Sequence, residues 1–396
     1  MGSKFTKQPH LYSCFATDLS VFAMTDPHEA TQRRNLIGPF FSRKAILNLE
    51  NVIQTQVDNL ISRLLEYKSH ETANLDFAFR ATSLDVITSY CFGLKGNLTS
   101  SKNFQNNVLL AMDSTLPMIW VFKYFPQIKH FLLSVPEWTA AYLKPGTTGI
   151  LEQRQEMGAQ IDKLLKDPKS LEDIEHETIY HHLLNPQPEN QRMPPISRTW
   201  LLDEGLYMRF AGSDTVGNVC TVGTYYILTN PRVHSTLAQE LREAWPELDS
   251  AVGYETLEKL PFLTAVIKES LRMAHGVVTP LPRIVGADSE ISGSIVPAGT
   301  VVSMGATVLH RNPDIFPNPY MFVPERWLQE DSNELEKYLV AFSKGSRSCL
   351  GIKYGYNTVD SLRCLFLRCN SLAWCELYLI FGNIFRKLAL DPRDPS

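Results

Sequence analysis

The sequence contains no apolar run long enough to cross a bilayer. A transmembrane helix needs about 20 consecutive residues that are mostly apolar. The opening segment, Met1-Gly-Ser-Lys-Phe-Thr-Lys, starts neither such a run nor the apolar core of a signal peptide. An excess of one charge is also missing, because 38 Lys and Arg residues stand against 42 Asp and Glu residues, a formal net charge of −4. We therefore expect a chain that is cytoplasmic as written, with no indication of nucleic acid as a partner.

Cysteine is scarce, and its placement argues against a disulfide framework. The seven cysteines are odd in number and irregularly spaced, which is typical of a protein in a reducing compartment. Cys364 and Cys369 form one close pair, but no second Cys or His pair stands at zinc-finger spacing, so incidental cysteines are the simpler interpretation. A Gly-rich dinucleotide or flavin fingerprint after a strand is also missing, so the sequence gives no indication that this chain binds a nicotinamide or flavin cofactor itself.

Helical patterning runs through most of the chain. Apolar residues recur at three- and four-residue steps, or in long apolar runs, and predict helices over residues 45–67, 84–92, 198–228, 231–245 and 260–273. The segment 185–197, NPQPENQRMPPIS, predicts a surface loop. Residues 283–303 instead carry short β-branched runs separated by Gly and Pro, as a small twisted sheet requires. The sequence therefore predicts a mainly α fold with a minor β region.

One cysteine lies in a loop of small residues beside a fixed cation, in the segment Phe342-Ser-Lys-Gly-Ser-Arg-Ser-Cys349-Leu-Gly351. Gly345 and Gly351 allow the backbone to turn tightly next to a flat ligand, and the guanidinium of Arg347 can pair with a carboxylate. Backbone N–H groups in such a loop can also point at the sulfur and tune it. For a lone cysteine, the simpler interpretation is a buried side chain in a Gly-containing turn. The complete pattern favours a thiolate site.

This pattern, F-x-x-G-x-R-x-C-x-G, resembles the heme-binding loop of the cytochrome P450 family at every specified position. The resemblance implies the cytochrome P450 fold. It makes Cys349 the axial ligand of the iron of heme b, and it implies a cofactor site shaped by Phe342, Gly345, Arg347 and Gly351. A thiolate ligand pushes electron density into the iron and favours cleavage of the O–O bond.

The segment Ala211-Gly-Ser-Asp-Thr215 interrupts a long apolar helix with a glycine and polar side chains. Such residues are unfavourable there, and a local violation of this kind suggests a site. A purely structural role is an equally open interpretation. The segment resembles the A-G-x-D/E-T motif of the same family, which implies that Asp214 and Thr215 help to deliver protons to bound oxygen.

Charged residues further along the chain extend the resemblance. Glu269 and Arg272 stand three apart on one helical face, which by itself indicates no more than a solvated ion pair. With Arg326 in the later segment Pro324-Glu-Arg-Trp327, they resemble the E-x-x-R helix of the family and the arginine that joins it. The resemblance implies a three-residue network that holds the core on the heme side in place.

Two more arginines match the family at positions that contact the heme propionates. Arg283 follows Pro280-Leu-Pro and precedes the β region, and Arg34 precedes Pro39-Phe-Phe-Ser. The resemblance implies that both guanidinium groups pair with propionates. The second match is incomplete, because Ala30 and Thr31 stand where a His-Arg pair is common in the family.

The resemblance implies a heme-dependent monooxygenase that uses molecular oxygen and receives electrons from NADPH through NADPH-cytochrome P450 reductase. Phrases such as RRNLIGPFFS most resemble filamentous-fungal members that oxidise terpenoid or polyketide intermediates, so we expect a lipophilic small molecule of secondary metabolism as substrate. The full-length family type acts at the cytosolic face of the endoplasmic reticulum. The alternative functions are an inactive, truncated heme-binding relic and, if the cysteine loop is coincidental, a non-heme helical interaction protein.

The chain departs from the family pattern in two places. Microsomal members begin with a membrane helix, a Pro-rich hinge and the first strands, so residues 1–396 predict a single cytochrome P450 domain that is incomplete at its N-terminus. Residues 353–371 then intervene before an apolar helical segment that begins at Leu372. An intron starting with GT inside the Lys353 codon and ending with AG inside the Ser371 codon would, on removal, leave an Asn codon and the text CLGINLAWCELYL. We interpret 353–371 as a retained intron, with a genuine surface loop as the alternative.

Overall fold

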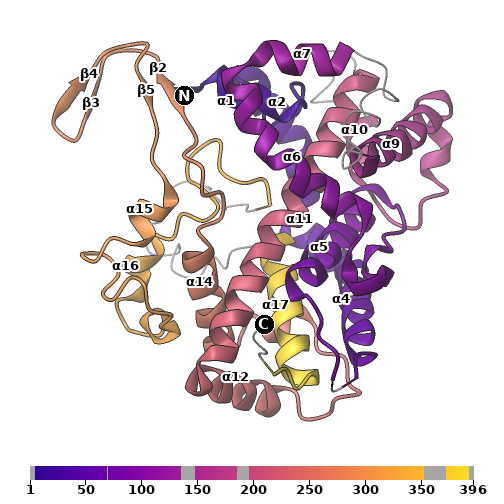
Figure 1. The fold of residues 1–396 in the computed structure, drawn as a ribbon, viewed down its shortest axis with the longest axis vertical. Coiled ribbons are helices and arrows are strands. Elements are labelled where there is room, and N and C mark those ends of the chain that lie inside the picture. The colour runs from indigo at the N-terminus through magenta and orange to yellow at the C-terminus, as the bar shows by residue number, and fades with distance from the viewer. Residues whose placement is uncertain (1–4, 69, 135–147, 185–195, 352–371, 392–396) are drawn as a thin grey trace. The chain divides into compact units, whose positions relative to one another are not determined.

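The computed structural model describes residues 5–68, 70–134, 148–184, 196–351 and 372–391. Within them the protein is mainly helical, and its short strands form two small antiparallel sheets (Figure 1). The predicted fold class, mainly α with a minor β region, is confirmed. The chain divides into two compact units, which we describe separately. Unit 1 comprises residues 1–37, 91–211 and 280–304, and unit 2 comprises residues 38–90, 212–279 and 305–396.

Unit 1 carries both sheets. The predicted β region forms β2 (Arg283–Val285), β3 (Ser289–Ile291), β4 (Ser294–Val296) and β5 (Val301–Val302), whereas β1 (Phe5–Lys7) was not predicted. The strand order of the larger sheet is β1-β2-β5, with Lys7 opposite Arg283. Strands β3 and β4 form a hairpin that extends from β2 and β5 (Figure 1). Its two turn residues, Ser292 and Gly293, both have positive φ, as a tight type I′ hairpin turn requires.

The helices of unit 1 are α1 (Pro9–Tyr12), α2 (Pro27–Ile37), α6 (Asn107–Tyr124), α7 (Pro126–Ser134), α9 (Thr148–Lys166), α10 (Ile179–Leu184) and the first part of α11 (Arg198–Thr229), with 3-10 turns η1 (Ser13–Phe15), η3 (Leu98–Ser100), η4 (Lys102–Phe104) and η6 (Pro168–Leu171).

Two acidic side chains of α11 fix the segment before α2. Asp203 Oδ2 accepts a hydrogen bond from Leu19 N at 3.1 Å, and Glu204 Oε2 accepts one from Val21 N at 2.7 Å. Glu204 is almost fully enclosed, and this burial raises the pKa of its carboxyl group to about 7.

The elements of unit 2 are α3 (Arg43–Asn48), α4 (Glu50–Leu65), most of α5 (Leu75–Phe92), the rest of α11, α12 (Pro231–Ala244), α13 (Tyr254–Leu257), α14 (Pro261–Ala274), α15 (Ala306–His310), α16 (Ser332–Glu336) and α17 (Leu372–Lys387), with 3-10 turns η2 (Gly38–Phe41) and η8 (Pro324–Trp327). Helix α17, yellow in Figure 1, is the centre of this unit. It packs against α4, α12, α13 and α14, and all of its residues from 374 to 385 are buried. A helix that is buried on every side belongs to the core.

Local signals explain where the predicted helices begin and end. At the start of α12, Asn230 caps the helix by accepting a hydrogen bond from Val233 N, and Pro231 occupies the first turn. The helix predicted over residues 45–67 is in fact two, because the backbone of Leu49, with φ −113°, ends α3 and precedes α4. The predicted loop 185–197 lies mostly outside the described residues.

The buried carboxylate of Glu269 is the polar centre of unit 2. Arg272 donates two parallel hydrogen bonds to it, from Nε at 2.9 Å and from Nη2 at 2.8 Å. Arg326 Nε at 3.2 Å, Val323 N at 2.9 Å and Trp327 Nε1 at 2.9 Å complete its shell. Glu269 and Arg272 are both 0% exposed. The carboxylate therefore fixes α14 against η8 and the segment before it.

Arg272 extends the same network to three backbone carbonyl groups. Its Nη1 donates to His310 O at 2.9 Å and to Pro319 O at 2.7 Å, and its Nη2 donates to Met321 O at 3.0 Å. Its guanidinium also lies 5.3 Å from the ring centroid of Phe316. Two of its N–H groups bind Glu269 on the same helix, and the others join α14 to distant parts of the chain. This use of several fixed donors distinguishes Arg from Lys.

Replacing Glu269 with Ala should destabilise the protein strongly, because two arginines and an indole N–H would lose their shared acceptor in a buried site. The expected loss is about 3–5 kcal/mol in the free energy of unfolding, seen as a low yield of soluble, heme-containing protein. The matched control is Glu334→Ala, which removes an exposed partner of Lys337 and should change stability little. A Glu269→Ala protein that folds and keeps its heme but loses turnover would make this residue catalytic instead of structural.

Candidate active site

The loop that carries Cys349 is closed by its own backbone. Cys349 N donates a hydrogen bond to Phe342 O at 2.9 Å, and Ser348 N donates one to Gly345 O at 3.0 Å. Gly345 has φ +81°, a conformation that side-chain-bearing residues rarely adopt. The ring of Phe342 lies 6.4 Å from that of Trp374 on α17. The predicted motif residues are therefore brought together in one tight turn of unit 2.

Cys349 differs from the other described cysteines in its accessibility. Its side chain is exposed, whereas Cys14, Cys91, Cys220 and Cys375 are buried. Burial raises the pKa of the Cys220 and Cys375 thiols well above the ordinary value, which disfavours the thiolate form that binds metals. Cys364 and Cys369 lie outside the described residues. Among the described cysteines, Cys349 is thus the one that can present sulfur to a ligand.

The residues around Cys349 fit a thiolate-bound heme. A Cβ atom placed on Gly351 would lie 3.5 Å from the sulfur, so glycine keeps the space beside the sulfur open. A single sulfur donor from the protein would suit an iron whose nitrogen ligands come from a porphyrin. Arg347, half-buried in the same loop, supplies the positive charge that a propionate needs. Within the described parts of the chain, no group of three or more His, Cys, Asp or Glu residues could hold a metal ion by itself.

The polar motif on α11 is anchored to α5. A Cβ atom on Gly212 would approach Ile87 Cγ1 to 2.9 Å, so the glycine permits close packing of the two helices. Ser213 Oγ donates to Arg80 O at 3.0 Å, and Asp214 Oδ1 accepts from Arg80 Nε at 2.9 Å. The glycine and these polar groups therefore have structural partners on α5. Thr215, the last residue of the motif, is exposed.

The two predicted propionate arginines belong to unit 1. Arg283 lies on β2, where its Nη1 donates to the Tyr12 hydroxyl and to Leu281 O. Arg34 lies in the last turn of α2, and its charge lowers the pKa of Glu204, partly offsetting the effect of burial. The propionate role of Arg34 and Arg283 stays a prediction.

Sequence reasoning missed two residues that hold the predicted ones. Trp327, which directly follows the predicted Arg326, donates a hydrogen bond to Glu269. A buried tryptophan needs a partner for its indole N–H, and this need is the signal by which the sequence indicates such a residue. Arg80 holds both Ser213 and Asp214. A single arginine in the apolar run Phe77-Ala-Phe-Arg80 indicates a buried partner, but the sequence cannot name that partner.

Comparisons with known proteins identify the family of the chain. The family model for cytochrome P450 matches residues 2–368. The chain is 34% identical to the cytochrome P450 monooxygenase claJ of Penicillium crustosum, over 98% of this chain and 85% of that protein. It is 33% identical to macH of Penicillium terrestre, over 98% of this chain and 74% of that protein. It is 31% identical to flvC of Aspergillus flavus, over 98% of this chain and 68% of that protein. Both of these relatives are also named cytochrome P450 monooxygenases.

The predicted fold family and enzyme class are thereby confirmed, and the family implies a heme cofactor. In the described part of the chain, no helix has the length and apolar character needed to span a membrane. A thiol-bearing glycine loop, a helical A-G-x-D-T motif, a buried Glu-Arg network and the matching relatives all lead to one conclusion: this chain belongs to the cytochrome P450 family of monooxygenases.

Proposed function

We propose that this chain is a heme-thiolate monooxygenase whose iron is bound by the sulfur of Cys349, and that it oxidises a lipophilic small molecule of fungal secondary metabolism. The exposed sulfur in a loop that its own backbone closes is the observation that supports this most. When bound, a thiolate-held heme activates molecular oxygen so that one oxygen atom enters the substrate. The protein contributes binding, orientation and proton supply.

Three arginines would hold the propionates of the cofactor. Arg347 is part of the thiolate loop, and Arg34 and Arg283 match the positions at which the family contacts the propionates. Arg283 is well suited to this role, because its hydrogen bonds to Tyr12 and to the carbonyl of Leu281 restrict its orientation before any ligand binds. Phe342 and Gly345 would shape the loop, and Gly351 would leave room beside the sulfur.

Proton delivery would be the task of Thr215 and Asp214. The Thr215 side chain is exposed on α11, so its Oγ1 can pass a proton to a group beside the helix. The Asp214 carboxylate is fixed by the 2.9 Å hydrogen bond from Arg80 and would hold the hydroxyl in its donating direction. Arg80 would act through Asp214 as a positioning residue.

An apolar substrate agrees with the aromatic cluster of unit 1. The rings of Phe22 and Tyr207 stack at 4.4 Å between centroids, and Phe15 lies edge-on to Tyr207 at 6.2 Å. Sites for lipophilic small molecules are lined mostly by apolar and aromatic side chains, which select by shape and hydrophobicity. A terpenoid or polyketide intermediate is the substrate class we propose, with electrons from NADPH through NADPH-cytochrome P450 reductase at the cytosolic face of the endoplasmic reticulum.

Replacing Cys349 with Ala should abolish the thiolate-ligated state. The measurement is the absorption spectrum of the reduced, carbon-monoxide-bound protein, whose Soret band is strongly red-shifted only with thiolate ligation. Cys220→Ala is the matched control and should keep the shifted band, because that thiol is buried. A shifted band that survives in Cys349→Ala would refute the ligand assignment. A wild-type chain with no such band would favour the alternative, a heme-binding relic without turnover.

Replacing Thr215 with Ala should leave the heme spectrum unchanged and divert oxygen reduction to hydrogen peroxide. The lost hydroxyl is part of the proton supply and not of the iron coordination. Peroxide released per NADPH consumed, measured with the reductase present, should rise several-fold. Thr215→Ser restores the hydroxyl and should return the ratio toward the wild-type value, and Thr229→Ala on the same helix should not change it. An unaltered ratio in Thr215→Ala would rule out the relay role.

We also propose that residues 353–371 are encoded by a retained intron and that removing them joins the thiolate loop to α17. These residues lie outside the described ones, but the helix that begins at Leu372 directly after them is buried along most of its length, as a core helix of the family is expected to be. Sequencing the transcript across this junction should yield CLGINLAWCELYL. A mature message that still encodes YGYNTVDSLRCLFLRC would make the segment a genuine insertion.

A further inference from the structure

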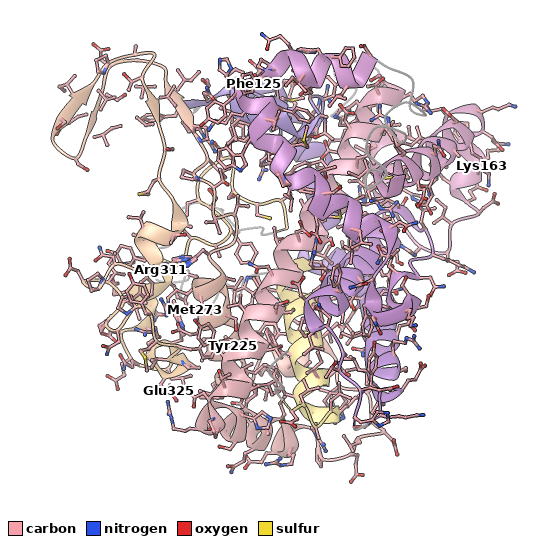
Figure 2. The ribbon with its side chains drawn as sticks, in the orientation of Figure 1. Phe125, Lys163, Tyr225, Met273, Arg311 and Glu325 are labelled. Atoms are coloured by element: carbon pink, nitrogen blue, oxygen red, sulfur yellow. The ribbon has the colours of Figure 1, made fainter. Side chains whose placement is uncertain are left out.

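Two buried histidines of unit 2 lie between the Glu269 network and the thiolate loop. His275 directly follows α14, and Figure 2 labels Met273 near the end of that helix. His310 is the last residue of α15, and the next residue, Arg311, is also labelled in Figure 2. Their rings stack, with centroids 5.6 Å apart and planes 28° apart, and their Nδ1 atoms are 3.4 Å from each other. His310 is 0% exposed and His275 is 6% exposed. Neither residue has a role in the chemistry described above.

The hydrogen bonds of His310 determine which of its nitrogen atoms carries a proton. Val340 N donates to His310 Nε2 at 2.9 Å, so Nε2 must be unprotonated. A neutral imidazole then carries its proton on Nδ1, which faces His275 Nδ1. The backbone of His310 is fixed as well, because its carbonyl accepts from Arg272 Nη1 at 2.9 Å. His310 thus joins the arginine network to the amide of Val340.

Val340 and Ala341 are the two residues that enter the thiolate loop. A second contact fixes them: a Cβ atom on Gly276 would lie 2.2 Å from Ala341 O, so this end of α14 touches the loop backbone directly. The next residue, Phe342, accepts the hydrogen bond from Cys349 N at 2.9 Å that closes the loop. The position of the Cys349 sulfur therefore depends on where residues 340 and 341 are held.

We propose that His310 is a positioning residue for the thiolate. As a neutral imidazole, His310 accepts the Val340 amide hydrogen and thereby sets where the loop presents Cys349. Protonation of His310 releases the loop. The inference rests on the proposed role of Cys349 as iron ligand. Protonation would place a proton on Nε2 and turn the acceptor into a donor that faces the Val340 N–H. The hydrogen bond would be replaced by a repulsive contact.

The surroundings of His310 favour its neutral form. Burial lowers the pKa of His310 to about 4, with further lowering by His275 and Arg272, while the nearby carbonyls of Arg272 and Tyr338 offset part of the effect. Burial also lowers the pKa of His275 to about 4, with the cations Arg311 and Arg272 adding to it. A histidine whose folded pKa lies below its ordinary value of 6.5 stabilises the fold fully above that pH. This stabilisation is lost as the pH falls toward about 4.

The test compares three variants by the reduced, carbon-monoxide-bound spectrum of the heme-containing protein between about pH 8 and about pH 2.5, a range that extends well below the pKa of about 4 of His310. His310→Gln keeps an acceptor for Val340 N but does not titrate near neutrality, and should hold the red-shifted band to about one pH unit lower than wild type. His310→Ala has no acceptor and should lose most of the band already at neutral pH. His28→Gln, an exposed histidine, should follow the wild type.

Amide hydrogen exchange at Val340 gives a readout that does not depend on turnover or on the spectrum. Protection should fall in His310→Ala, persist in His310→Gln, and decrease for wild type with the same acid midpoint as the red-shifted band. Equal acid midpoints in wild type and His310→Gln, or unchanged Val340 protection in His310→Ala, would overturn the role of His310. Absence of the band in wild type at neutral pH would instead overturn the ligand role of Cys349. If His310→Ala does not fold, the midpoint of His310→Gln decides.

Discussion

The carboxylate of Glu269 is the group on which the architecture of unit 2 depends. A buried charge is tolerated only when its partners and hydrogen bonds are complete, and five donor groups surround this one. Because these donors come from α14 and from the continuous stretch of residues 323–327 that contains η8, the requirement to pair one charge fixes two distant segments of chain against each other. Phe316 and Trp327 pack together beside them as an apolar cluster, which keeps water away and strengthens each hydrogen bond.

The same network reaches the chemistry by a short route through the backbone. Arg272 donates a hydrogen bond to the carbonyl group of His310, and the imidazole of His310 accepts one from the Val340 amide. Val340 enters the loop that is closed at Cys349. The order of the contacts explains how residues far apart in sequence can affect one sulfur atom. Rigid support of this kind matters because a thiolate ligand must meet its metal within a few tenths of an ångström.

In the motif on α11, residues that are unfavourable in an apolar helix can be explained either by function or by packing. Gly212 and Ser213 are out of place in an apolar helix, and they point to function when only the sequence is considered. Their partners on α5, Ile87 and the backbone of Arg80, show that close packing and a buried hydrogen bond also account for them. The proposed catalytic role consequently concentrates on Thr215, with Asp214 held by Arg80. Only the pairing of helices distant in the sequence separates these two causes.

The sequence by itself determined the fold class, several of the long helices and the family, and it carries the motif on which the proposal of a thiolate loop rests. Each of these depends on local periodicity or on a compact motif, as with residues 342–351. The break at Leu49, the strand β1, and the roles of Arg80 and His310 were decided by tertiary structure. Strand β1 forms because Phe5–Lys7 meets β2, and its sequence alone carries no strand signal. His310 carries no local sign of function either, because its meaning lies in a hydrogen bond to an amide 30 positions away, and a linear pattern does not encode such a contact.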